Sequence, residues 1–99
     1  HRDVDVFALP YLRPVLGDAR VVRLRHRQAR DTIARFDNED IETQHQLRAV
    51  ASAYFYLGKH DLAIDRLETA LRRGGPHRDA ILLDLEAVRT ARLAARSSN

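Results

Sequence analysis

The stretch LRAVASAYFYLGKHDLAIDRLETALRRGGP, from Leu47 to Pro76, decides the fold that this sequence predicts. In its first half, apolar and small residues recur every three or four positions, which is the period of an amphipathic helix. Gly58 then permits a tight turn, and a second helical period follows and ends at the stop formed by residues 74–76. The stretch therefore predicts two helices packed as a hairpin. The residues expected to pack inside it are Leu47, Val50, Ala51, Tyr54, Ala63, Leu67 and Ala70.

This pattern resembles one tetratricopeptide repeat (TPR), an antiparallel helix pair of roughly 34 residues. The resemblance depends most on Tyr54, Gly58, Ala63 and Ala70, because the glycine allows the turn and the alanines let the paired helices approach closely. It covers about a third of the chain. It implies an all-α fold in which antiparallel helical hairpins are stacked as a short TPR-like α-solenoid. The implied function is non-enzymatic, the recognition of a protein or peptide partner.

The length of 99 residues fits a single domain. Its expected segments are an irregular stretch or short helix over 1–17, a basic helix over 18–36, the TPR helical hairpin over 39–73 and a C-terminal capping helix over 78–96. We expect Asp18 to cap the basic helix, the acidic run 37–42 to cap a helix that begins near Glu39, and Asp61 to cap the next one. Whether residues 10–36 form a degenerate earlier repeat is left open. The chain has no methionine, and we expect it to be a piece of a longer protein.

The resemblance also implies a binding groove, because in this family the first helix of each pair lines the concave surface. The residues spaced to form that stripe are His45, Arg48, Ser52 and Phe55. Some family members hold a C-terminal carboxylate with a Lys and an Asn on this helix. Arg48 can take the place of the Lys, but Ser52 stands where the Asn would be, so we expect a groove centred on Arg48 without that specific ligand.

Charge is distributed in a basic, acidic, basic order along the chain, although the net charge is only +3. Within the helix expected over 18–36, residues 19–36 hold six arginines against Asp31, and the candidate basic patch consists of Arg20, Arg23, Arg27 and Arg30. Such a row of cations can contact nucleic-acid phosphates, but no aromatic residue is interleaved to stack on bases. An acidic protein partner, or pairing within the chain to residues 37–42, is the favoured interpretation.

The sequence contains no recognisable catalytic or metal-binding motif, and we expect no enzyme, no cofactor and no metal site. It has no cysteine, its five histidines lack the spacing of H-E-x-x-H, and no serine lies in G-x-S-x-G. Residues 37–42 do not follow the order of a calcium loop. No apolar run is long enough to cross a bilayer and no signal peptide is present, which favours a soluble, cytoplasmic protein without membrane association.

Two alternatives to partner binding stay open. One clear repeat is below the roughly three repeats that a self-sufficient stack needs, so the chain can instead self-associate as a homo-oligomer or cap the array of a larger protein. Nucleic-acid binding through the arginines of residues 20–35 is the other alternative.

Overall fold

A computed structural model describes residues 19–38 and 43–97 of this protein. The described residues form four helices in this order: α2 (Ala19–Phe36), α3 (Gln44–Tyr56), α4 (His60–Arg73) and α5 (Arg78–Ser97). No strand occurs in the described ranges, so the expected all-α class is confirmed. The expectations for residues 1–17, for Asp18 as a helix cap and for the acidic residues 39–42 lie outside the described residues.

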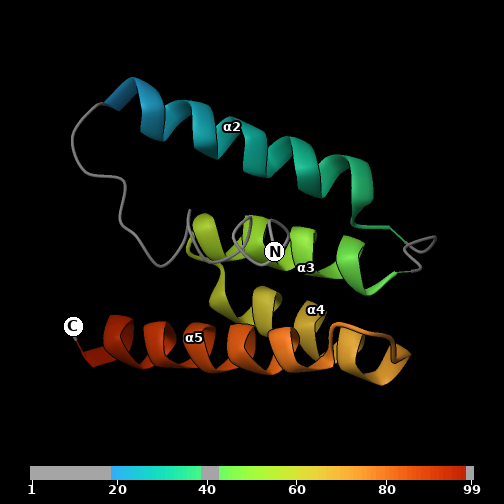
Figure 1. Ribbon diagram of the computed structural model, residues 1–99. Coiled ribbons are helices and arrows are strands. Elements are labelled where there is room, and N and C mark those ends of the chain that lie inside the picture. Colours follow the sequence, from blue (N-terminus) through green and yellow to red (C-terminus); the bar gives the residue numbers. More distant parts are fainter. Residues whose placement is uncertain (1–18, 39–42, 98–99) are drawn as a thin grey trace.

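The helices form a single stack in which each one packs against the next along the chain. Figure 1 shows α2 and α5 at the two ends of this stack, with α3 and α4 between them. The described hairpin is therefore covered on both sides, by α2 on α3 and by α5 on α4. This is the expected arrangement of stacked helical hairpins.

Helix α3 begins later than the sequence suggested to us. We expected a start near Glu39, with acidic caps, whereas the helix starts at Gln44. Thr43 is the N-cap, its hydroxyl accepts from the Gln46 backbone N–H at 3.1 Å, and the Gln46 side chain accepts from the Thr43 backbone N–H at 3.2 Å. This reciprocal capping box satisfies two amides that would otherwise lack an acceptor, and it fixes the helix start.

The turn between α3 and α4 is built on Gly58, which has a positive φ of 80°. The backbone N–H of Gly58 donates to the Phe55 carbonyl, and that of Lys59 donates to the Tyr54 carbonyl, both at 2.9 Å. Lys59, rather than the expected Asp61, occupies the N-cap position of α4, and its side chain makes no capping bond. Asp61 lies in the first helical turn, where a negative charge favours the helix dipole.

A hydrophobic core runs through the stack, and the seven residues named above as packing inside the hairpin are buried in it, while Leu71, also expected to face inward, is partly buried against it. Its members are Leu47, Val50, Ala51, Tyr54, Phe55, Ala63, Ile64, Leu67, Ala70, Ile81, Leu85 and Val88. Ala63 and Ala70 have no exposed surface, which fits close approach of the packed helices. Ala29 of α2 is also buried, and Ile33 and Phe36 pack against the core from the same helix.

Buried Gln44 holds the connection between α4 and α5 from the start of α3. Its Nε2 donates to the Ala70 carbonyl at 3.0 Å, and its Oε1 accepts from the His77 backbone N–H at 2.8 Å. The Ala70 carbonyl is one of the last four carbonyls of α4, for which the helix itself supplies no N–H donor. Gly75 approaches the same side chain closely, since a Cβ there would lie 2.7 Å from Gln44 Oε1. One amide thus links three helices.

Asp37, just after α2, joins the end of that helix to the hairpin. Its carboxylate accepts from Nε and Nη2 of Arg66 at 2.7 and 2.9 Å, and the Tyr54 hydroxyl donates to the same group. The hydrogen bond from Arg66, followed by that from Tyr54, holds the pKa of Asp37 below its ordinary value, although burial opposes this. Burial, and then the nearby Asp37, raise the pKa of Tyr54. The described acid of the run 37–42 therefore binds α3 and α4, not the arginines of α2.

A membrane-spanning segment is not among these elements, because no described helix combines sufficient length with sufficient apolarity to cross a bilayer.

Candidate interaction surfaces

The four residues expected to line a groove on α3 have different surroundings in the structure. Arg48, Ser52 and Phe55 are all buried, and His45 alone is exposed. The Ser52 hydroxyl donates to the Ala49 carbonyl at 2.9 Å, while Phe55 belongs to the core and packs its ring against that of His60. The expected stripe is thus not an open row of side chains.

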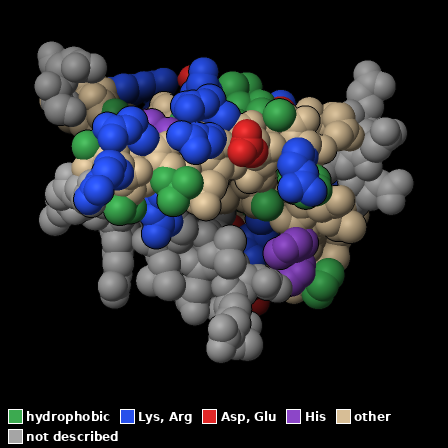
Figure 2. Space-filling model, turned by 90° about the horizontal axis from the view of Figure 1, so that it is seen from above, with side chains coloured by type: hydrophobic (Ala, Val, Ile, Leu, Met, Phe, Trp, Pro, Cys, Tyr) green, Lys and Arg blue, Asp and Glu red, His purple; other side chains and the backbone are tan. Residues whose placement is uncertain are grey.

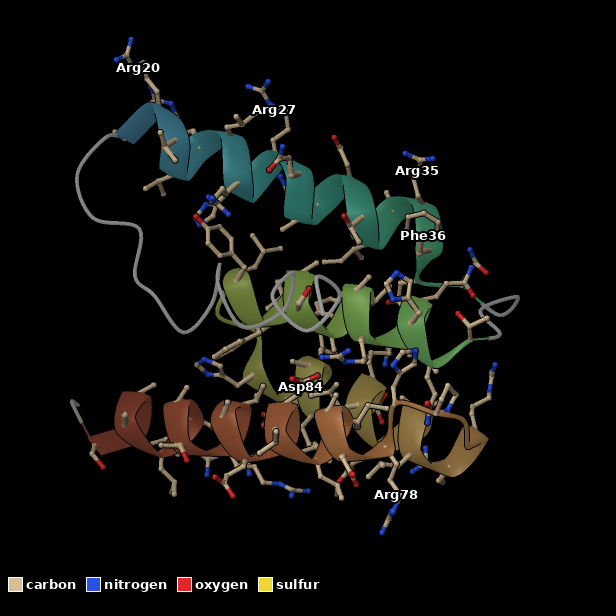
Figure 3. The ribbon with its side chains drawn as sticks, viewed as in Figure 1. Arg20, Arg27, Arg35, Phe36, Arg78 and Asp84 are labelled. Atoms are coloured by element: carbon tan, nitrogen blue, oxygen red, sulfur yellow. The ribbon has the colours of Figure 1, made fainter. Side chains whose placement is uncertain are left out.

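Arg48 shows why this face of α3 is closed. Its side chain is directed at α5, where Nε lies 2.7 Å from Oδ2 of Asp84, and the residue is only 3% exposed. Figure 3 shows Asp84 pointing from α5 into the stack toward α3. Burial raises the pKa of the Asp84 carboxyl, and Arg48 opposes that rise through its hydrogen bond and charge. The positive charge expected to meet a partner is neutralised inside the protein.

The arginines of α2, in contrast, are presented to the surroundings. Arg20, Arg23, Arg27 and Arg30 are all exposed, so the structure places the whole candidate basic patch on the outer face of one helix. Figure 2 shows these basic side chains spread over that face, and in Figure 3 Arg27 and Arg35 point away from the other helices. Within the described residues, no carboxylate forms an ion pair with Arg23, Arg27 or Arg30.

Apolar side chains accompany this basic patch. Val21 is 40% exposed and Leu24 is 48% exposed, and both lie on the first turns of α2 beside the arginines. Asp31 is the sole acidic residue of the helix. The outer face of α2 is therefore cationic and partly apolar.

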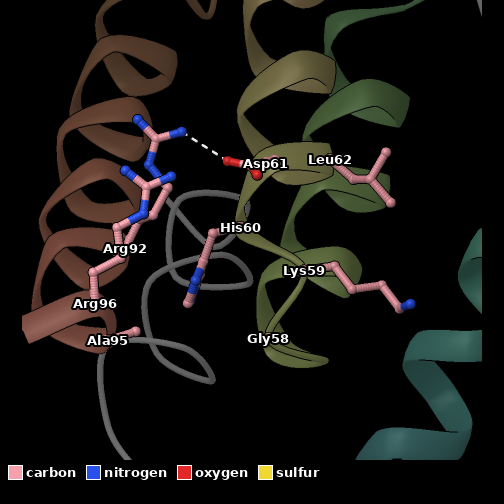
Figure 4. Close-up of a pocket in the computed structure, with 8 residues that line it drawn as sticks. All are labelled: Gly58, Lys59, His60, Asp61, Leu62, Arg92, Ala95 and Arg96. Atoms are coloured by element: carbon pink, nitrogen blue, oxygen red, sulfur yellow. Dashed lines mark hydrogen bonds and ion pairs between the residues drawn. The ribbon is translucent and has the colours of Figure 1, made fainter. Parts of the chain in front are cut away.

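A cleft of about 400 Å³ lies where the α3–α4 turn meets the end of α5. In Figure 4, Arg92 and Arg96 approach it from α5, while Lys59 and Leu62 point to the opposite side. Nη1 of Arg92 donates to Oδ1 of Asp61 at 2.7 Å, and this bond lowers the pKa of Asp61. The Arg92–Asp61 pair joins α5 to α4 at this cleft.

The outer side of α5 forms the third surface. It exposes three leucines, Leu82, Leu83 and Leu93, together with charged residues of both signs. Arg89 on its flank reaches Glu68 of α4, with Nη2 and Oε2 2.9 Å apart. No neighbouring described helix covers the leucines.

Histidines in the described ranges pack against other rings. The edge of one ring contacts the face of the other in the His26–Tyr56 pair, with centroids 5.1 Å apart, and His45 lies near His77. Groups of three or more His, Asp or Glu side chains suited to a metal ion do not occur within residues 19–38 and 43–97.

Comparison with protein-family models, with curated proteins and with solved structures found no match to this chain.

Two features of these surfaces were not predicted from the sequence. The burial of Arg48 depends on Asp84, which is 36 residues away, and no local sequence pattern predicts that pair. The exposed leucines of α5 were expected to belong to a capping helix, but only the fold shows which of its sides stays uncovered.

Proposed function

We propose that this protein is a non-enzymatic protein-interaction module with a TPR-like fold, and that it binds an acidic segment of a protein partner along the outer face of α2. The observation that carries the proposal is the exposed row of Arg23, Arg27 and Arg30, next to exposed Leu24. The hairpin supports the TPR-like part, since Gly58 has a positive φ and Ala63 and Ala70 are fully buried, as the resemblance implies.

We place the contact on α2 rather than on α3 because accessibility differs between the two helices. Arg48 is the centre of the groove expected from the sequence, and its charge is neutralised by Asp84. The α2 arginines have spacings of four and three residues, so they project from one side of the helix. A partner with carboxylates at helical spacing fits this row by charge complementarity.

The apolar residues favour a protein partner over nucleic acid. Phosphate groups are bound by cations and hydrogen-bond donors, to which an apolar side chain adds nothing, whereas Val21 and Leu24 offer surface to apolar side chains of a peptide. The described part of α2 presents no exposed aromatic ring on which a base could stack. An acidic amphipathic peptide is therefore the expected ligand class.

The test uses two fluorescent probes of similar charge, an amphipathic peptide rich in Glu and Leu, and a single-stranded oligonucleotide. Replacing Arg23, Arg27 and Arg30 together by Gln should weaken peptide binding about tenfold, since each exposed ion pair contributes roughly 0.2–1 kcal/mol. The matched control replaces the exposed Arg72, Arg73 and Arg78 by Gln, which removes the same charge from another surface.

A second variant separates the two partner classes. Val21→Ser with Leu24→Ser should weaken peptide binding and leave oligonucleotide binding unchanged. Equal loss of peptide affinity in both arginine triple variants would overturn the α2 assignment. An oligonucleotide that binds more tightly than the peptide, and is insensitive to the serine changes, would replace the protein partner by nucleic acid.

A further inference from the structure

A regular row of residues on α5 is left uncovered by the stack. Six residues with alternating spacings of three and four lie along it, all of them exposed: Asp79, Leu82, Glu86, Arg89, Leu93 and Arg96. This alternation keeps them on one side of the helix over about five turns. Leu82 is 41% exposed and Leu93 is 63% exposed, so the row offers apolar surface at two points.

The chemical order of this row is self-complementary. Its first half carries acids around Leu82, and its second half carries arginines around Leu93. The row is symmetric about the point between Ala87 and Val88. Counted in residues from that point, each acid has an arginine at the same separation on the other side, and the two leucines are also equidistant from it. A second α5 that runs antiparallel about this point would therefore meet each member of the row with its complement.

We propose that the protein forms a symmetric homodimer in which α5 of one copy packs antiparallel against α5 of a second copy. The three contacts, each made twice, are Asp79 with Arg96 of the second copy, Leu82 with Leu93, and Glu86 with Arg89. Such a closed two-fold interface uses the same patch on both copies. The alternating spacing is that of heptad positions a and d, and in an antiparallel helix pair each a position lies opposite a d position.

The other ways to cover this row with a second copy are less favourable. Parallel pairing would set acids against acids and arginines against arginines, which is destabilising. Pairing of two α2 helices would bring two rows of arginines together. The contact between Arg89 and Glu68 does not block the dimer, because both side chains are half-exposed and a guanidinium has five N–H donors.

The expected dimer is weak. One pair of helices buries less than the roughly 800 Å² per partner of a standard stable interface. The fraction of dimer should therefore rise with concentration, and it should fall with salt, since four of the six row positions are charged.

The first experiment is sedimentation velocity of the full chain over a range of concentrations. Leu82→Ser and Leu93→Ser should each raise the dimer dissociation constant at least about fivefold, because each removes apolar contact at both symmetric positions. Leu24→Ser on α2 is the matched control, as this leucine has a similar exposed fraction and lies at the far end of the stack. The Leu24→Ser variant should dimerise as the unchanged chain does.

The decisive experiment mixes two charge variants. Asp79→Arg and Arg96→Glu should each be monomeric alone, because like charges then meet at both ends of the row. An equimolar mixture should form a heterodimer, since Arg at position 79 of one copy meets Glu at position 96 of the other, and the remaining Asp79 and Arg96 also meet. Asp31→Arg and Arg30→Glu on α2 are the controls and should dimerise like the unchanged chain.

Each alternative result counts against the proposal. A chain that is monomeric at every concentration has no such dimer. A dimer that survives Leu82→Ser and Leu93→Ser uses another surface. If the two charge variants are monomeric alone and stay so when mixed, α5 is covered by something other than an antiparallel second copy. Circular dichroism of every variant checks that helicity is retained.

Discussion

Arginine has two contrasting environments in this protein, inside the stack on α3 and along the outer face of α2. Arg48 is buried and paired with Asp84, whereas Arg23, Arg27 and Arg30 are exposed and meet no described carboxylate. The difference follows from position in the stack, because α3 has neighbours on both sides and α2 has a described neighbour on one side only. The inner face of a helix pairs its polar side chains within the fold, as Arg48 shows, and the outer face of an end helix leaves them exposed, as the arginines of α2 show.

The same contrast applies to leucine. Leu67 of α4 is completely buried, while Leu83 of α5 is 66% exposed. Burial of an aliphatic side chain stabilises the folded chain by about 1.5–3 kcal/mol, and an exposed leucine contributes little. Residue type alone therefore does not separate the residues that build the fold from those that face outward.

The first prediction concerns the stability that a buried and an exposed leucine contribute. Leu67→Ala should lower the free energy of unfolding by about 3 kcal/mol, because it removes buried surface and leaves a cavity. Leu83→Ala should change it by less than about 0.5 kcal/mol. Chemical denaturation at a concentration where the chain is monomeric measures both. Similar losses in the two variants would mean that α5 is covered in the isolated monomer.

The next prediction compares how much a buried and a half-exposed ion pair contribute to stability. Arg48→Ala should cost about 3 kcal/mol of unfolding free energy, because it leaves the buried Asp84 carboxyl without its cation. Arg89→Ala should cost less than about 1 kcal/mol, since the pair with Glu68 is half-exposed. Replacing both Arg48 and Asp84 by Leu should recover much of the loss. Equal costs for Arg48→Ala and Arg89→Ala would remove the distinction between inner and outer arginines.

A weaker, pH-dependent loss of stability is expected at Asp37, which lies at the boundary between α2 and the hairpin. Its pKa in the folded protein is lowered, mainly by Arg66, so its stabilisation is complete above the ordinary carboxyl pKa of about 4 and is lost as the pH falls below that value. Asp37→Asn should cost about 1 kcal/mol at pH 7, and the gap to the unchanged chain should close toward pH 3. Denaturation curves at several pH values measure this gap. A gap that stays constant with pH would show that the charge of Asp37 does not stabilise the fold.

Local patterns in the sequence predicted most of the fold. The ends of α2 agree to within a residue, and α4 ends at Arg73 before the glycines, as expected. The late start of α3 also had a local signal, because Thr43 and Gln46 have the spacing of a capping box. We assigned that start to the acids of residues 37–42 instead, since acids at a helix start are a more conspicuous pattern.

The candidate surfaces were predicted less well, for a reason that the groove residues make clear. The period of α3 correctly separated Tyr54, Leu47 and Val50 as core residues, but it left His45, Arg48, Ser52 and Phe55 as one outer stripe. A helical period says which residues share a side of a helix. It does not say how many of those sides the neighbouring helices cover.

The helices, their turns, the core of the hairpin and the charge of α2 can be predicted from local sequence, because they depend on residues within a few positions of one another. The packing of the helices is needed to see that Asp84 neutralises Arg48, that Gln44 holds the α4–α5 connection, and that Asp37 binds Arg66. These contacts join residues 26 to 36 positions apart, so their partners are set by how whole helices pack. The same packing decides which row of α5 stays exposed, and this row is where we propose that a second copy of the chain binds.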